Sequence, residues 1–280
     1  MKKALLIGIN RYVLSKATLR GCVNDITQMS ATLTRYFKFN PANIRMLADE
    51  RATKANIIDR IKWLVADAKP GDTLVLHFSG HGSLISLRDA YGKVLDPREP
   101  ILCTYELNWD NPLTFREIGK LLAAPEGVNI TSVLDSCHCG HDFKDLNQDV
   151  IPRFLPPPID ISYRDYSIAT KAPVVIKLSE DTDIIMAACG LTQTSADAFI
   201  NGTYRGAFTF CLNEAMASFK YKTDYVNAIA KTGLVLKNNR FSQMPQLFGA
   251  TNKFSRWPIF DNPVASITQP AKKEMEDEKK

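Results

Sequence analysis

The chain has 280 residues, of which 45% are hydrophobic and 23% charged, and its formal net charge is +5. This composition is that of a globular protein with a sizeable core. The positive excess is small and no Lys/Arg-rich tract alternates with aromatic residues, so nucleic-acid binding is not expected. No apolar run approaches the roughly 18 residues that a membrane span requires, so a membrane partner is not expected either.

The start of the chain carries a short apolar run at residues 4–9 with no small-residue cleavage site after it. This run is too short for a signal peptide, which leaves the cytoplasm as the expected location. Six cysteines are spread along the chain without the density of a disulfide framework. In a reducing compartment we expect them to be thiols, most of them packed as small hydrophobic residues.

The first third of the chain alternates predicted strands and helices. The apolar run at 4–9 predicts a strand that is covered on both faces. Asn24 and Asp25 offer N-cap side chains for a helix in which apolar residues recur at helical spacing up to Phe37. The further elements predicted here are a strand at 44–47, a helix at 53–68 capped by Thr53, and a strand at 73–78.

The rest of the chain continues this alternation around two irregular stretches. Residues 83–109 carry scattered acids and prolines and are predicted to be loop-like. Thr114 and Glu117 form a capping box that opens a helix through Leu122. Residues 144–173 hold five prolines and predict an exposed loop or linker. The remaining predicted elements are strands at 130–134 and 183–188 and helices at 207–219 and 224–236.

Strands that alternate with helices predict an α/β fold with a mostly parallel central sheet and helices on both faces. In such sheets, binding and catalytic sites form at the carboxyl ends of the strands. His81 follows the predicted strand at 73–78, and Cys137 follows the predicted strand at 130–134. We therefore expect both side chains at one edge of the sheet.

A cysteine beside a histidine is the arrangement of a thiolate nucleophile with a proton shuttle. Cys137 is the candidate nucleophile, because a thiol is only a few per cent ionised at neutral pH until a base assists it. His81 is the candidate base, and it can later protonate the leaving amine. The backbone N–H groups of Gly82 and Cys137 are candidates for the oxyanion hole, since glycine permits close approach of the backbone.

Several motifs give the chain a resemblance to the metacaspase branch of the caspase-like cysteine peptidases, of the bacterial, prodomain-less type. The spacing between His81 and Cys137 is close to the about 50 residues typical of caspases. The motifs, in family order, are LRGCVND at 19–25, HFSGHG at 77–82, DSCHCG at 135–140, ACG at 188–190, QTSAD at 193–197, GAFT at 206–209 and PQL at 245–247. The resemblance implies a caspase-like three-layer sandwich and an endopeptidase that cleaves after Arg or Lys.

Two carboxylates are candidates for selecting that basic side chain. Asp25 lies in the first turn of a predicted helix and Asp135 lies two residues before Cys137. If both face one pocket they favour a guanidinium or ammonium group, and Arg can bind in a bidentate manner. The resemblance adds Cys22 and Ser79 to this pocket. Without it, Asp25 could simply complement a helix N-terminus and Asp135 could bond within its own turn.

Metal binding is a separate question. Many family members have an acid-rich calcium site after the histidine, and the corresponding residues here are Asp96, Asp110, Asn111 and Glu99. One carboxylate fewer weakens a site for a cation that takes 6–8 oxygen ligands. We therefore expect no required cofactor, with weak calcium binding as the alternative. The CHCGH run at 137–141 lacks the usual C-x₂₋₄-C spacing and a second ligand pair, so zinc is not expected.

The resemblance implies one peptidase domain over residues 1–268 and a charged, disordered tail at 269–280. The domain divides into a large-subunit-like part at 1–143, a proline-rich linker at 144–182 and a small-subunit-like part at 183–268. The expected partners are peptides or proteins with Arg or Lys at the cleavage site, and the expected state is a monomer. The alternative is a non-proteolytic binding or regulatory module, suggested by Cys139, where the family usually has serine. The linker's basic residues are expected sites of self-cleavage: Arg153, Arg164, Lys171 and Lys177.

Overall fold

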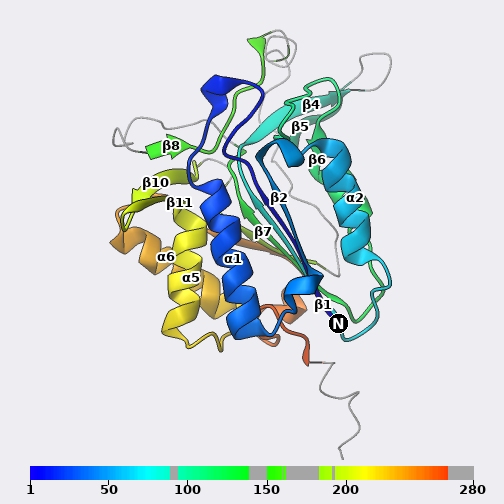
Figure 1. The fold of residues 1–280 in the computed structure, drawn as a ribbon, viewed down its shortest axis with the longest axis vertical. Helices are drawn as coiled ribbons and strands as arrows, with labels where there is room; N and C mark the ends of the chain where they lie inside the picture. Colours follow the sequence, from blue (N-terminus) through cyan, green and yellow to red (C-terminus); the bar gives the residue numbers. More distant parts are fainter. Residues whose placement is uncertain (89–93, 139–149, 160, 162–182, 191–192, 264–280) are drawn as a thin grey trace, which may run out of the picture.

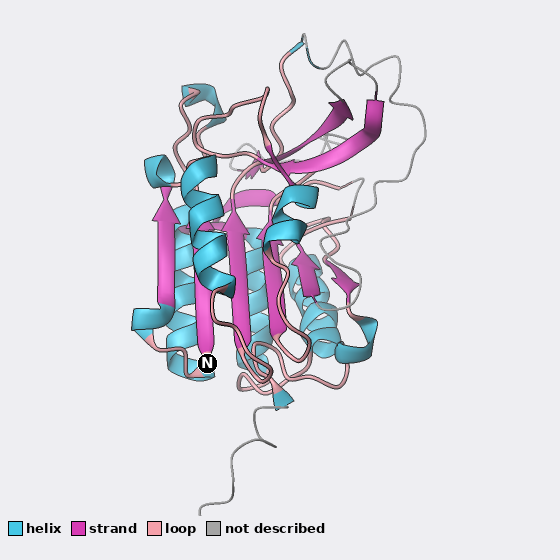
Figure 2. Cartoon of the chain, turned by 90° about the vertical axis from the view of Figure 1, so that its right-hand side faces the viewer, coloured by secondary structure: helices cyan, strands magenta, loops and turns pink. Residues whose placement is uncertain are grey.

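The computed structural model describes residues 1–88, 94–138, 150–159, 161, 183–190 and 193–263. Its centre is a six-stranded sheet in the order β12-β9-β7-β3-β1-β2, parallel except for β12. The parallel strands run in one direction across the middle of the molecule (Figure 2). Their bounds are Lys2–Gly8 (β1), Ile44–Ala48 (β2), Thr73–Ser79 (β3), Asn129–Asp135 (β7), Asp183–Ala187 (β9) and Gln246–Gly249 (β12).

Helices cover both faces of this sheet, which confirms the expected three-layer α/β sandwich (Figure 1). In β1, Leu5 and Ile7 belong to the core cluster under one face, whereas Ala4 and Leu6 belong to the cluster under the other. Because successive side chains of a strand point to opposite faces, a continuous apolar run serves both cores. The first face is covered by α2 (Lys54–Val65) and α3 (Phe115–Leu121), and the second by α1 (Cys22–Phe37), α5 (Ala207–Ser218) and α6 (Tyr225–Asn238).

The helix starts show one wrong prediction. Thr53 and Thr114 cap α2 and α3 as expected, each accepting a hydrogen bond from a backbone N–H of the first turn. Helix α1 instead begins at Cys22, before the predicted caps, and the Asn10 side chain accepts from the Cys22 N–H at 2.8 Å. Asp25 is therefore free of a capping role.

Short 3₁₀ turns occupy Ser15–Ala17, Pro41–Asn43, Asp49–Arg51 and Thr251–Lys253.

Two small sheets lie beyond the carboxyl ends of the central strands, on the side away from the N-terminus (Figure 1). One joins β11 (Thr203–Gly206), β10 (Ala196–Ile200) and β8 (Val150–Pro152). The other joins β4 (Gly82–Arg88), β5 (Val94–Leu102) and β6 (Leu113–Thr114). Between them they enclose the edge of the sheet at which the candidate residues were expected.

Residues 83–109 were predicted to be loop-like, and this is wrong because β4 and β5 form an antiparallel hairpin. The prolines of β5 concealed the strand. The prolines are tolerated because most of β5 pairs with a neighbour on one side only. On its other side lies β6, which is two residues long and pairs with Ile101 and Leu102 at the end of β5. A proline without an N–H fits such an edge.

The expectation of an exposed linker is wrong for residues 150–155, whereas Pro156, Pro158 and Ile159 are exposed as expected. Residues Val150–Pro152 form β8 and the following Arg153 is completely buried. Residues 139–149 and 162–182, and the tail predicted at 269–280, lie outside the described residues. In the part of the chain that is described, no helix is both long and apolar enough to cross a bilayer.

Candidate active site

His81 and Cys137 are brought to one edge of the sheet by two neighbouring strands. In the β3/β7 pair, Ser79 lies opposite Asp135, so the two candidates each lie two residues beyond the last pair. The Gly80 N–H donates to the Asp135 carbonyl at 3.3 Å, which continues the pairing past the strand ends. Both side chains are buried. The placement at adjoining strand ends agrees with the sequence prediction.

The hydrogen bonds of His81 define its tautomer. Its Nε2 lies 2.9 Å from the carbonyl oxygen of Ala17. A carbonyl can only accept, so Nε2 carries the proton and Nδ1 of the neutral ring keeps a lone pair. Burial, together with the charge of Arg153, lowers the pKa of His81 to about 4, so the ring is neutral at physiological pH and able to accept a proton.

The backbone around Cys137 converges on a single oxygen atom. The N–H of Gly82 donates to the carbonyl of Arg153 at 3.0 Å, and the N–H of Cys137 donates to the same carbonyl at 3.1 Å. These are the two groups that the sequence nominated for an oxyanion hole. The Cys137 thiol lies 2.7 Å from the carbonyl of Gln193, its Sγ donating to that oxygen. Two donors aimed at one carbonyl is the geometry by which peptidases stabilise a tetrahedral oxyanion.

The side chain of Arg153 occupies a completely buried acidic pocket. One guanidinium nitrogen, Nη2, donates to Asp25 at 2.7 Å and to Asp197 at 3.0 Å. The other, Nη1, donates to the Ser79 hydroxyl at 2.8 Å and lies 3.2 Å from the Asp135 carboxylate. All three carboxylates and the guanidinium have no solvent-exposed surface. The carboxylates therefore meet the planar, forked guanidinium of Arg153 from several sides.

The electrostatics of this pocket depend on the guanidinium. Burial raises the pKa of Asp25 to about 6, although Arg153 and the Ser79 hydroxyl lower it. Burial alone would lower the pKa of Arg153, but the surrounding carboxylates outweigh that effect and hold it well above its ordinary value. Without a cation, the pocket would hold three like charges away from water, which is strongly unfavourable. The guanidinium of Arg153 provides the compensating positive charge.

Cys22 lies close to Arg153 and to the carboxylates of this pocket. It is buried at the start of α1, and burial raises the pKa of its thiol well above the ordinary value. Arg153 opposes this rise, while the carboxylates of Asp197 and Asp25 add to it. Cys22 therefore contributes a neutral, compact wall and no negative charge.

The sequence did not nominate Asp197 for the pocket. Besides Arg153, its carboxylate accepts the N–H groups of Gly21 at 2.9 Å and Arg20 at 2.7 Å, which fixes it against the start of α1. The one sequence feature that could have indicated a role for Asp197 is its place in the QTSAD motif at 193–197. Arg153 was nominated only as a cleavage site in an exposed linker, and nothing in its local sequence marks a buried position.

Of the residues nominated for calcium, Glu99 and Asn111 have other polar partners and Asp110 is exposed. Glu99 is buried and accepts the N–H of Arg116 at 2.9 Å, with the Arg116 guanidinium beside it. The side-chain oxygen of Asn111 accepts from the Lys54 ammonium at 2.7 Å, and Asp110 is exposed. The side chain of Asp96 lies outside the described residues. Within the described ranges, no three His, Cys, Asp or Glu side chains converge as a metal site would require.

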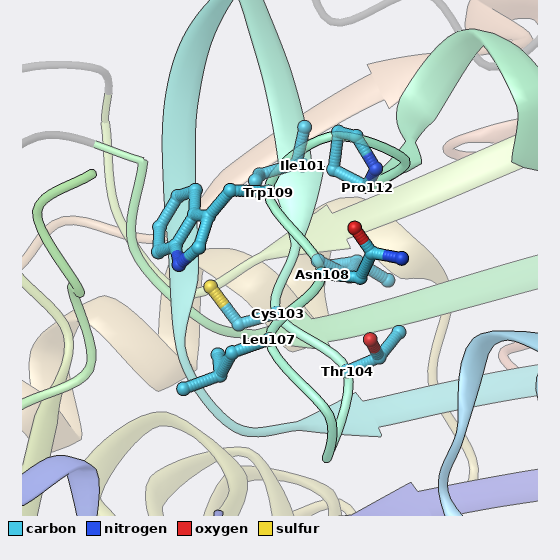
Figure 3. A pocket seen from close by; sticks show the side chains of 8 residues that line it. Ile101, Cys103, Thr104, Leu107, Asn108, Trp109 and Pro112 are labelled. Carbon is cyan, nitrogen blue, oxygen red and sulfur yellow. The ribbon is translucent and has the colours of Figure 1, made fainter. Parts of the chain in front are cut away.

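A separate hollow is lined by residues that include Cys103, Leu107 and Trp109 (Figure 3). Cys103, which contributes to its lining together with Trp109, donates its backbone N–H to the His81 carbonyl at 3.0 Å. None of the eight residues that line the hollow carries a charge. It therefore offers no counter-charge for a basic side chain, in contrast to the acidic pocket.

Comparison with known proteins agrees with this geometry. The family model described as "Metacaspase, peptidase C14 domain" matches residues 2–146. Metacaspase-1 of Meyerozyma guilliermondii is 29% identical over 88% of this chain and 68% of its own length. Metacaspase-3 of Trypanosoma brucei brucei is 32% identical over 88% of this chain and 70% of its own length.

The fold is also shared with a solved structure. A crystal structure of a protein from Geobacter sulfurreducens superposes with a TM-score of 0.67 at 23% identity and covers 93% of this chain and 99% of that one. At this identity the likeness concerns the fold alone. The family match and the metacaspase relatives go further, and they show that the chain belongs to the metacaspases, in the C14 family of cysteine peptidases.

Proposed function

We propose that this metacaspase is an endopeptidase that cleaves after arginine, and less efficiently after lysine, through a dyad of Cys137 and His81. The observation that carries the proposal is the placement of Arg153. Its carbonyl accepts from the two N–H groups beside the thiol, while its guanidinium fills the acidic pocket. Main chain and side chain of one residue thus occupy the two places that a peptidase provides for the residue before the scissile bond.

In this proposal the roles follow from the two residue types and from their positions at neighbouring strand ends. His81 keeps its proton on Nε2 through Ala17 and uses Nδ1 to take the proton of the Cys137 thiol. The thiolate attacks the carbonyl carbon, and the N–H groups of Gly82 and Cys137 hold the oxyanion. Removing one such donor costs about 10²–10³ in kcat in a serine peptidase, so these two bonds are a large part of the expected rate.

The preference for arginine over lysine rests on the separate partners of the two guanidinium nitrogens. Nη2 meets Asp25 and Asp197, and Nη1 meets Ser79 and Asp135. A lysine ammonium is a single point donor on a flexible stem and cannot reach all four partners at once. We therefore expect kcat/KM for arginine substrates to exceed that for lysine substrates by at least about tenfold, the effect of about 1.4 kcal/mol.

The test is turnover of fluorogenic peptides that differ only in their last residue, Arg, Lys or Asp. The proposal expects Arg > Lys ≫ Asp, and loss of turnover in Cys137→Ala and in His81→Ala. The alternative, a non-proteolytic module, predicts no turnover and no labelling of Cys137 by an active-site thiol probe. Cleavage only after Asp would contradict the specificity.

We extend the proposal to the setting in which the enzyme works. It acts as a monomeric single domain over residues 1–268, in the cytoplasm, and without a metal requirement. The pairing of Glu99 with Arg116 and of Asn111 with Lys54 supports activity without calcium. Running the peptide panel in calcium and in chelator tests this directly, and the proposal expects rates that agree within about twofold.

A further inference from the structure

A second cavity lies at the end of the central sheet opposite to the dyad. Lys2, which begins β1, contributes to its lining, so the cavity borders the amino ends of the parallel strands. Its other walls come from the end of α1, from residues 221–224 between α5 and α6, and from residues 255–261. Its volume of about 540 Å³ is that of a site for a small molecule.

The charges around this cavity are mostly positive, since four cations and two carboxylates line it. Lys2 pairs with Asp261 at 2.9 Å, and Asp224 accepts two hydrogen bonds from Asn227 at the start of α6. The other three cations are exposed and form no ion pair within the described part of the chain: Lys38, Lys222 and Arg256. They leave a positive charge that an anion can neutralise.

Aromatic side chains form much of the remaining wall. The rings of Tyr36 and Tyr221 are stacked, with 3.6 Å between their centroids and 9° between their planes. Phe37 meets the Tyr221 ring edge-on at 6.0 Å, and Trp257 adds a fourth aromatic side chain. Aromatic rings next to cations are the combination that binds a planar base linked to phosphate.

Two of the lining residues occupy positions at which glycine is usual. Helix α1 ends at Lys38 with φ 61°, and its N–H donates to the Leu33 carbonyl. Tyr221 follows α5 with φ 60°, and its N–H donates to the Met216 carbonyl at 2.8 Å. Helices commonly end with a residue in this left-handed conformation, and glycine predominates because other side chains are strained there.

The strain at Lys38 has no evident return within the fold. The Tyr221 ring packs against Tyr36 and Phe37, whereas the Lys38 side chain is exposed and makes no hydrogen bond or ion pair with the described residues. A crevice left between loops would account for the cavity. It gives no reason for a lysine where the backbone favours glycine, but an anionic ligand does.

We propose that this cavity is a binding site for a nucleoside polyphosphate, which combines a planar ring with several negative charges. The aromatic side chains contact the base, and the three cations contact the phosphates. A polyanion without a ring would leave the aromatic wall uncovered, and a neutral ring would leave the cations without a counter-charge. The inference is independent of the proposed function, because neither the dyad nor the acidic pocket contributes to the lining.

The first measurement is isothermal titration calorimetry of the full-length protein, in chelator, with ATP, ADP, AMP, adenosine and tripolyphosphate. We expect one site per chain and affinities in the order ATP > ADP > AMP, because each phosphate adds negative charge close to the cations. Adenosine and tripolyphosphate should each bind at least 10-fold more weakly than ATP. Cys137→Ala should bind ATP as tightly as the wild type, since the dyad is remote from the cavity.

The second measurement separates ligand binding from a structural role. Lys38→Gly removes one cation and places glycine at a left-handed position, so ATP should bind at least fivefold more weakly while the urea midpoint equals or exceeds that of the wild type. The matched control is Arg240→Gly, because Arg240 is also an exposed cation with a positive φ, of 63°, but lies outside the cavity. This control should keep the affinity for ATP within twofold.

A third variant tests the aromatic wall. Tyr36→Leu keeps an apolar side chain in the last turn of α1 and removes the ring that stacks on Tyr221. ATP should bind at least fivefold more weakly to this variant, whereas the affinity for tripolyphosphate should stay within twofold of the wild type.

The contrary results are specific. No saturable binding of ATP up to about 1 mM, the concentration that corresponds to only about 4 kcal/mol of binding free energy, would overturn the inference. Equal affinities for ATP and tripolyphosphate would overturn it as well, since the ring would then contribute nothing. Unchanged ATP binding in Lys38→Gly would place the nucleotide elsewhere, and a fall in stability that accompanies the loss of binding would assign Lys38 to the fold.

Discussion

Replacing Asp25 with asparagine tests the acidic pocket most selectively, because the change keeps the shape of the side chain and removes one charge. The carboxylate of Asp25 receives Arg153 at 2.7 Å, the Ser79 hydroxyl at 2.7 Å and the Gly206 N–H at 2.9 Å. Breaking one side of a desolvated, hydrogen-bonded charge pair costs about 2–5 kcal/mol. Since 1.4 kcal/mol is tenfold, kcat/KM for arginine peptides should fall by about 30-fold to 5,000-fold.

The pH profile gives this prediction a second readout. Arginine binding needs the ionised form of Asp25, which is present above its pKa and is lost as the pH falls through that value. Burial raises the pKa of Asp25 to about 6 even with Arg153 beside it. In the wild type, kcat for arginine peptides, which reports the pocket with a guanidinium bound, should therefore decline below about pH 6, and Asp25→Asn should remove this acid limb.

The assay is steady-state hydrolysis of one arginine peptide from pH 5 to pH 8. The matched control is Asp59→Asn, which changes an exposed aspartate paired with Arg60 and should leave the whole profile unchanged. Alkylation of Cys137 by iodoacetamide should proceed at the same rate in all variants, since the dyad is untouched. An Asp25→Asn profile within threefold of wild type, acid limb included, would refute the reasoning.

Two further predictions concern the scaffold of the site. Gly82→Ala should lower kcat at least 100-fold, because the added methyl group would meet the Cys137 carbonyl and the His138 ring. The circular-dichroism spectrum should remain that of a folded protein. A kcat above a tenth of the wild-type value would contradict this prediction. Burial lowers the pKa values of His77, His81 and His138 to about 4, so between about pH 6.5 and 4 the unfolded state binds protons that the folded state does not. At pH 5 each of these histidines should lower the free energy of unfolding by about 2 kcal/mol, and the raised pKa of Asp25 should offset about 1 kcal/mol of the total. Urea titrations at pH 7 and pH 5 measure the difference, and equal unfolding midpoints would contradict the prediction.

The central sheet and the candidate dyad could be predicted from sequence because their signals are local. The apolar run that becomes β1 is continuous, since both of its faces are buried, and it differs visibly from surface segments. The strands before His81 and Cys137 have the same character, and both are buried at every position. Parallel pairing then places their carboxyl ends together without further information.

The occupied pocket could not be predicted, because it is made by pairing between distant parts of the chain. Residues 150–155 read as a proline-rich linker, and only docking against β10 and Gly82 gives them a fixed conformation. Burial of Arg153 depends on three aspartates that are widely separated in sequence. A lone arginine beside prolines carries no sign of such partners, and an aspartate in a strand such as β10 carries no sign of a charge opposite it.

The most direct test of the account compares two peptides, Val-Ile-Pro-Arg and Val-Ile-Pro-citrulline, each carrying the same fluorogenic leaving group. The first three residues are those of β8, and citrulline keeps the size and planarity of arginine while removing its charge. If the three carboxylates select the cation, kcat/KM should fall at least 1,000-fold on this replacement. Equal turnover of the two peptides would show that the buried acidic pocket does not select the substrate, and the account would be wrong.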